Sequence, residues 1–144
     1  MNRWEVLTLG CFSRNRYWGE LDTKSYRRAL CTSTMITTKE GEHILVDPAV
    51  AGAELVQVLD ERCGMKPEDV DYVFITHHHG DHSVGMVDLP QARWLVAPGD
   101  VEQVRCHLPE YAGRIFPAGD RVTPEVKVIP LPGHTAGLSG LLFE

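Results

Sequence analysis

Residues 70–82 read Val-Asp-Tyr-Val-Phe-Ile-Thr-His-His-His-Gly-Asp-His, an apolar run that leads directly into four imidazoles and a carboxylate. An apolar run of this length is typical of a buried strand, so the polar side chains follow where that strand ends. Successive side chains on an extended backbone point to opposite faces, so His77 and His79 can aim at one point while His78 turns away. The stretch therefore predicts a metal site at a strand end.

A third candidate ligand, His134, follows a second apolar run. Residues 126–131 are Val-Lys-Val-Ile-Pro-Leu, and residues 132–137 are Pro-Gly-His-Thr-Ala-Gly. Alone, a histidine in a glycine-flanked loop is more often a hydrogen-bonded loop residue, but beside the first motif we expect it to be a ligand. An expression tag or a solvated histidine tract is a poor alternative for the first motif, because that motif lies in mid-chain behind a strand and includes Asp81.

These residue types indicate metal-assisted chemistry. Imidazole suits zinc, iron, copper or nickel, and Asp81 and His82 add one oxygen and one nitrogen ligand, so two metals are feasible. Zinc held by three protein ligands keeps its fourth position for water and lowers the pKa of that water to about 7. We expect one or two zinc ions, with iron or manganese as alternatives.

Three separated motifs resemble those of the metallo-β-lactamase superfamily, and the resemblance covers the chain from about Trp4 to its end. It implies an α/β fold, a metallo-β-lactamase-like αββα sandwich that is truncated after the strand following His134. It also implies that residues 1–144 form one such domain with an incomplete second half. The motifs are Ile44-Leu45-Val46-Asp47-Pro48, His77-x-His79-x-Asp81-His82 and Pro-Gly-His134-Thr-x-Gly.

The resemblance assigns roles to the motif residues. His77, His79 and His134 would form the first metal site, while Asp81 and His82 would belong to the second. Asp81 would also orient the nucleophile, which makes it the candidate catalytic residue.

Asp47 would be a supporting residue near the metals rather than a ligand. The alternative is an ordinary turn aspartate at a strand end before proline.

The second metal site is only half built in this sequence. The family usually continues through a second half that supplies a bridging aspartate or cysteine and a final histidine, but no Asp, Cys or His follows His134. Residues 138–143 also read as a strand without a terminating turn. We expect a fragment of a longer protein, with a symmetric homodimer or a natural short form with one metal as alternatives.

Composition fits a globular protein. The chain has 144 residues, 43% of them hydrophobic, which is enough to bury a core. Its net charge of −6 argues against nucleic acid or anionic membranes as partners, and a small-molecule substrate is expected instead. Neither a secretory signal nor a membrane span is evident, so a cytoplasmic location is the default expectation.

The remaining histidines and the cysteines carry no comparable pattern. We interpret His43 and His107 as ordinary surface or turn residues. The four cysteines show no Cys-x-x-Cys spacing and are expected to be reduced.

Periodicity predicts alternating strands and helices, as in a layered α/β domain. We expect strands at 4–9, 30–38, 43–47, 71–76, 93–97 and several from 115 onward, helices at 51–62 and 99–107, and a turn or short helix at 66–69.

Residues 14–28 stand out in an acidic chain, because they hold five basic and three aromatic residues. If this segment folds over the metals, it could grip an anionic or flat substrate. The alternative is a solvated hairpin whose aromatic side chains pack locally.

The leading hypothesis is a metal-dependent hydrolase in which a metal-bound hydroxide attacks an ester, lactone or thioester. The Pro-Gly-His-Thr-x-Gly form is similar to that of lactonases and glyoxalase II-like thioesterases. Three alternatives remain open: a phosphodiesterase similar to ribonuclease Z, an iron-dependent dioxygenase, and a catalytically inert fragment.

Overall fold

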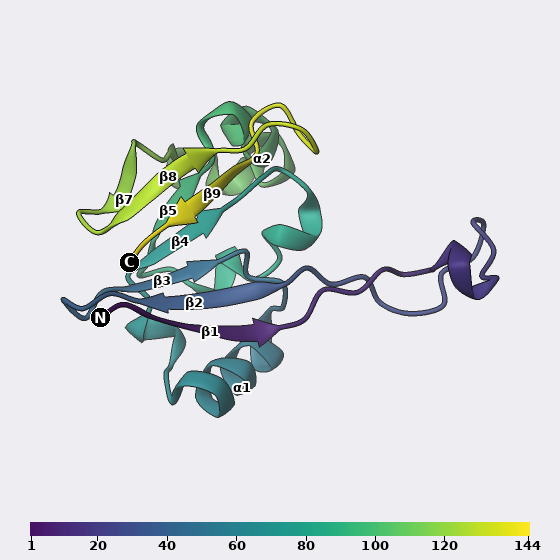
Figure 1. Cartoon of the computed structure of the whole chain (residues 1–144), viewed down its shortest axis with the longest axis horizontal. Coiled ribbons are helices and arrows are strands. Elements are labelled where there is room, and N and C mark those ends of the chain that lie inside the picture. Colours follow the sequence, from purple (N-terminus) through teal and green to yellow (C-terminus); the bar gives the residue numbers. More distant parts are fainter.

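The computed structural model describes all of residues 1–144, which form two β-sheets and a layer of helices (Figure 1). A six-stranded sheet has the order β1-β2-β3-β4-β5-β6, and a three-stranded sheet has the order β7-β8-β9. The strands are β1 (Arg3–Thr8), β2 (Ser33–Thr37), β3 (His43–Val46), β4 (Tyr72–Ile75), β5 (Arg93–Val96), β6 (Ile115–Pro117), β7 (Arg121–Thr123), β8 (Val126–Pro130) and β9 (Ser139–Leu142).

Two α-helices and six short 3-10 helices connect these strands. The α-helices are α1 (Gly52–Cys63) and α2 (Val101–His107). The 3-10 helices are η1 (Arg16–Trp18), η2 (Pro67–Asp69), η3 (Gly80–His82), η4 (Met86–Asp88), η5 (Pro98–Asp100) and η6 (Pro109–Arg114).

The larger sheet is buried on both faces because its strands alternate between two cores. Met35 pairs with Leu45 and joins the core beneath the helices, whereas the next pair, Ile36 and Ile44, joins the core beneath the smaller sheet. Both α1 and α2 pack into the first of these cores. The layers are therefore helices, six-stranded sheet and three-stranded sheet, and no helix covers the outer face of the smaller sheet.

This arrangement confirms the expected mixed α/β sandwich, with three of the four αββα layers in this chain. The expected elements form within a few residues of their predicted bounds. One difference is that residues 98–100 form a 3-10 turn, so α2 begins at Val101 rather than at residue 99.

The sheet places the polar motifs together. Strands β3, β4 and β5 are parallel neighbours, so their carboxyl ends lie at one edge of the sheet. Asp47 follows β3, His77 follows β4 and Asp100 follows β5. The loop after β8 reaches the same edge, where the amide of Ser139 donates to the carbonyl oxygen of Thr76 at 3.0 Å.

Candidate metal centre

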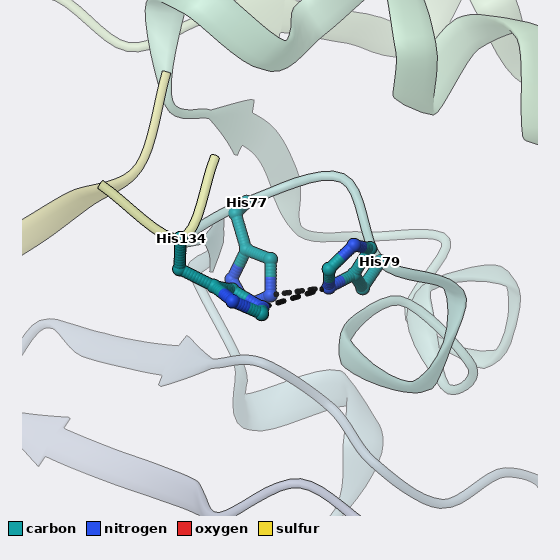
Figure 2. A group of neighbouring side chains, drawn as sticks. All are labelled: His77, His79 and His134. Atoms are coloured by element: carbon teal, nitrogen blue, oxygen red, sulfur yellow. Dashed lines mark hydrogen bonds between the residues drawn. The ribbon is translucent and has the colours of Figure 1, made fainter. Parts of the chain in front are cut away.

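Three imidazoles converge at the carboxyl end of β4. His77 and His79 come from the loop after β4, and His134 comes from the loop between β8 and β9 (Figure 2). Nδ1 of His79 lies 3.1 Å from Nε2 of His77 and 2.9 Å from Nε2 of His134. The ligand atoms of all three lie within 4.8 Å of one another. A tetrahedral zinc with Zn–N bonds of 2.0–2.1 Å separates its nitrogens by about 3.3 Å, so these residues fit one zinc ion.

His78 turns away from this point, as the alternation of an extended backbone predicts. Its Nδ1 and its backbone nitrogen each lie 3.0 Å from Oδ2 of Asp100, which is buried with 2% of its surface exposed. The loop therefore directs His77 and His79 to one side and anchors His78 on the other.

Burial favours the neutral, metal-binding form of these imidazoles. The pKa of His77 is lowered to about 4, first by burial and then by the neighbouring His82, against an opposing effect of Asp47. The pKa of His79 is also lowered, first by burial and then by His134. A metal needs an unprotonated ring nitrogen, so little proton competition is expected at neutral pH.

Asp81 and His82 lie beside the three histidines. The rings of His77 and His82 have centroids 4.0 Å apart, and Nε2 of His82 lies 3.8 Å from Oδ2 of Asp81. The Asp81 side chain is 43% exposed. These two residues thus present one nitrogen and one oxygen next to the first cluster, as the second-metal hypothesis requires.

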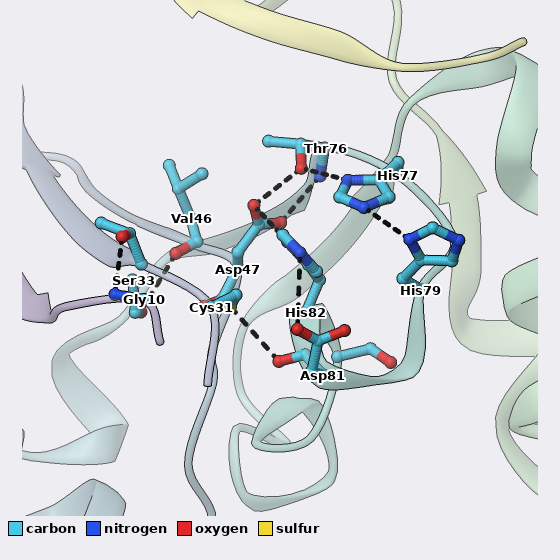
Figure 3. Close-up of polar contacts among 12 residues, drawn as sticks. Gly10, Cys31, Ser33, Val46, Asp47, Thr76, His77, His79, Asp81 and His82 are labelled. Atoms are coloured by element: carbon cyan, nitrogen blue, oxygen red, sulfur yellow. Dashed lines mark hydrogen bonds and ion pairs between the residues drawn. The ribbon is translucent and has the colours of Figure 1, made fainter. Parts of the chain in front are cut away.

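Asp47 lies between Thr76 and His82 and contacts both (Figure 3). Its buried carboxylate accepts hydrogen bonds from the amide of Thr76 at 2.8 Å and from the Thr76 hydroxyl at 2.7 Å, and it lies 2.9 Å from Nδ1 of His82. Burial lowers the pKa of His82, but Asp47 and Asp81 outweigh that effect and raise it. Asp47 also has a positive φ of 50°, which aspartate tolerates better than most residues. The residue is both a turn aspartate and a partner of a candidate ligand.

Two further residues lie at this edge that were not singled out in the sequence. Cys31 is buried, and its thiol lies 3.2 Å from the carbonyl oxygen of Asp81 and 3.5 Å from that of Asp47. Burial, then the charges of Asp47 and Asp81, raise its pKa to about 12, so it stays a thiol. Asp100 is the second. The only hint in the sequence was its position shortly after the apolar run 93–97.

A cavity of about 540 Å³ opens in front of the histidines. One wall carries the polar groups of His79, Asp81, His82 and His134. The other lining residues belong to two chain segments at the base of a projecting arm, residues 10–12 and 29–32.

The basic segment does not fold over the metal site. Residues 14–28 form the outer part of the arm, which extends away from the sheets in Figure 1, and none of them lines the cavity. Several of their charges pair within the segment, for example Arg16 with Asp22 and Arg27 with Glu20, whereas Arg28 pairs with Glu54 of α1. The segment is therefore solvated, as the alternative expected, but its aromatic side chains pack locally only in part: Arg27 lies over the Trp18 ring, whereas Tyr17 is 99% exposed.

The residues without a predicted role lie outside the cluster. His43 contacts Thr37 at the opposite end of β3, and His107 is exposed on α2. All four cysteines are free, as expected.

The sequence matches a family of known hydrolases. A family model of the metallo-beta-lactamase superfamily matches residues 26–143. The hydroxyacylglutathione hydrolase of Dechloromonas aromatica is 33% identical over 105 residues, which are 71% of this chain and 36% of that protein. An N-acyl homoserine lactonase of a Bacillus species is 33% identical over 98 residues, covering 62% of this chain and 39% of the lactonase. This chain thus spans less than half the length of these relatives.

Solved structures show the same fold. A putative metallo-beta-lactamase from Thermotoga maritima superposes with a TM-score of 0.65 at 19% identity, covering 99% of this chain and 72% of that one. The dizinc quorum-quenching lactonase AidC superposes with a TM-score of 0.60 at 16% identity, covering 81% of this chain and 52% of the lactonase chain. None of the helices in the structure combines the length and apolar character that crossing a membrane requires.

Proposed function

This chain belongs to the metallo-beta-lactamase superfamily, and from that premise we propose that it is a metal-dependent hydrolase acting on an ester, lactone or thioester. The observation that carries the proposal is the convergence of His77, His79 and His134 with their ring nitrogens turned toward one point. Three imidazoles suit zinc, and we propose zinc as the metal.

The surrounding side chains have distinct parts in this proposal. A bound zinc supplies Lewis acidity, which acidifies water and polarises a carbonyl oxygen. His77, His79 and His134 would hold the ion. Asp81 is partly exposed at the cavity, so its carboxylate can accept a proton from the attacking water and orient that water. His82 would bind a second ion with Asp81.

Asp47 would act through its neighbours rather than on the substrate. Its carboxylate lies against Nδ1 of His82, which leaves Nε2 directed toward Asp81. A carboxylate behind an imidazole fixes the ring orientation and increases its basicity, which is a common arrangement around metal-binding histidines.

The cavity supports an acyl substrate. Phe12, Ala29 and Leu30 line the same cavity as the histidines and offer an apolar surface to a carbon chain or thioester group. The named relatives, a hydroxyacylglutathione hydrolase and an N-acyl homoserine lactonase, both have names that describe acyl compounds. The phosphodiesterase alternative has less support, because the basic residues 14–28 that would meet a phosphate do not line the cavity.

The test is a substrate panel on zinc-loaded protein. An aryl ester, a thioester and an aliphatic lactone should be hydrolysed, and an aryl phosphodiester should not. Replacing His77 with alanine should abolish hydrolysis, whereas His43→Ala, a histidine at the far end of β3, should retain it. Hydrolysis of the phosphodiester alone, or equal activity in both variants, would contradict the proposal.

A further inference from the structure

Asp100 lies at the N-cap position of α2, but its side chain does not cap the helix. It is the residue before α2, a position where aspartate usually accepts hydrogen bonds from the first amides of the helix. In this structure the side chain makes no such bond. The carboxylate is 2% exposed and faces the metal-site loops instead. A buried carboxylate that leaves a helix uncapped needs other partners.

Those partners come from both loops that carry the candidate ligands. Oδ2 of Asp100 accepts hydrogen bonds from the backbone amide of His78 at 3.0 Å and from the hydroxyl of Thr135 at 2.8 Å, and it lies 3.0 Å from Nδ1 of His78. His78 stands between His77 and His79, and Thr135 is next to His134. One oxygen atom is therefore bonded to the immediate neighbours of all three histidines.

The backbone around Asp100 also packs closely against the loop between β8 and β9. A Cβ atom added to Gly137 would lie 2.2 Å from Oδ1 of Asp100 and 2.5 Å from the carbonyl carbon of Gly99. A Cβ on Gly99 would lie 2.7 Å from Cα of Gly137. Two glycines thus let the loop after β8 rest directly on the turn that holds Asp100.

We propose that Asp100 is a positioning residue that joins the two ligand-bearing loops, so that His134 meets His77 and His79 at metal-binding distance. The inference rests on the proposed function in that it takes the three histidines as the metal site. His79 and His134 are exposed, so packing of their own side chains does not fix them. Their positions depend on the loops, and the loops are tied at Asp100.

The decisive variants alter the hydrogen bonds of Asp100 and leave all histidines in place. Thr135→Val removes one hydroxyl from a buried position at nearly constant volume, and Thr135→Ser keeps the hydroxyl. Asp100→Asn keeps the size of the side chain and removes its charge. The matched control is Asp88→Asn, because Asp88 also joins a loop to a helix start, through a 2.7 Å hydrogen bond from the amide of Gly52, but lies away from the histidines.

Zinc affinity is measured by competition with a chromophoric chelator, and the ligand geometry is followed in the visible spectrum of the cobalt-substituted protein. We expect about 10–100-fold weaker zinc binding in Thr135→Val and in Asp100→Asn, the range typical of losing an interaction that orients metal ligands. Thr135→Ser and Asp88→Asn should bind zinc as tightly as the wild type. The cobalt spectrum should change in the first two variants only.

A double variant tests whether both residues act through one contact. Asp100→Asn combined with Thr135→Val should weaken zinc binding no more than the stronger single variant, because the two share a hydrogen bond. If Asp100→Asn fails to fold, Thr135→Val carries the test alone. Wild-type zinc affinity and an unchanged cobalt spectrum in Thr135→Val would overturn the inference and leave the proposed function standing. Failure of the wild type itself to bind zinc would overturn both.

Discussion

Protonation of His77 is set by its surroundings, since it is the only buried member of the histidine cluster. Its ring has no water shell to stabilise a positive charge, and its closest ring neighbours are other imidazoles. At the scale of single residues, His77 is therefore held in the neutral form that a metal ion requires. Asp47 is the opposite case, a buried charge that is stabilised by hydrogen bonds from Thr76.

The first prediction concerns the pH dependence of His77. Its pKa is about 4 in the folded protein against 6.5 in an unfolded chain. In the metal-free protein the unfolded chain takes up this proton first, so the stability contribution of His77 is complete above pH 6.5 and is lost as the pH falls from about 6.5 to about 4. Ring resonances of His77 in a nuclear magnetic resonance titration should show a neutral imidazole at pH 5.5. A midpoint near 6.5 would refute this.

The second prediction concerns Asp47. Asp47→Ala should lower the free energy of unfolding by about 3 kcal/mol, because two hydrogen bonds to a charged acceptor are lost and Thr76 is left without its partner. Asp47→Asn should cost clearly less, since its amide oxygen can still accept from Thr76 and asparagine tolerates a φ of 50°. Urea unfolding of the metal-free proteins measures both. Equal losses in the two variants would contradict this explanation.

At the scale of elements, the site depends on how loops meet rather than on the strands themselves. Parallel strands β3, β4 and β5 bring their ends to one edge, but the loop after β8 comes from the other sheet. Its attachment relies on close backbone contact at Gly99 and Gly137 and on the hydrogen bond from Ser139 to Thr76.

The third prediction tests that contact. Gly137→Ala would place a methyl group 2.2 Å from the Asp100 carboxylate, so the loop must move. We expect a loss of about 2 kcal/mol in the free energy of unfolding, as is typical of overpacking. Gly133→Ala is the matched control, because it lies in the same loop and its added Cβ would meet nothing within 4 Å. If thermal and urea unfolding show the same stability for both variants, the contact is not tight.

Elements built from local patterns were predictable from the sequence. The strand before His77 and the helix after Ala51 are encoded in consecutive residues. The alternation of side chains in the loop after β4 also predicted that His78 points away from His77 and His79. The roles of Cys31, Asp100 and Thr135 were not predictable, because each acts across the fold. Cys31 contacts a carbonyl 50 positions away, and Asp100 meets Thr135 across 35 positions. No periodicity in one sequence encodes such contacts.

At the scale of the whole molecule, two sheets and a helix layer form the body, and the arm between β1 and β2, residues 9–32, projects from it (Figure 1). The arm exposes Phe12, Tyr17 and Trp18, whose exposed fractions are 81%, 99% and 71%. The arm therefore adds little to either core. A symmetric homodimer stays a prediction, which the mass of the protein in solution would test.

The fourth prediction concerns the arm. Replacing residues 13–28 with Asn-Gly should leave the thermal unfolding midpoint nearly unchanged, because the bridge between Cys11 and Leu30 lets a two-residue hairpin turn close the gap. Zinc affinity should also be retained, since no candidate ligand lies in the deleted segment. Calorimetry and chelator competition measure these quantities. A large loss of either would show that the outer arm supports the body.

We propose that His77, His79 and His134 together hold one metal ion. The most direct test is zinc content per chain by elemental analysis of purified protein after exposure to zinc and removal of excess, in the wild type, His134→Ala and His43→Ala. We predict at least one tightly held zinc in the wild type and in His43→Ala, and loss of that zinc in His134→Ala. A wild type without zinc, or a His134→Ala variant that retains it with equal affinity, would show that these three histidines do not form a metal site.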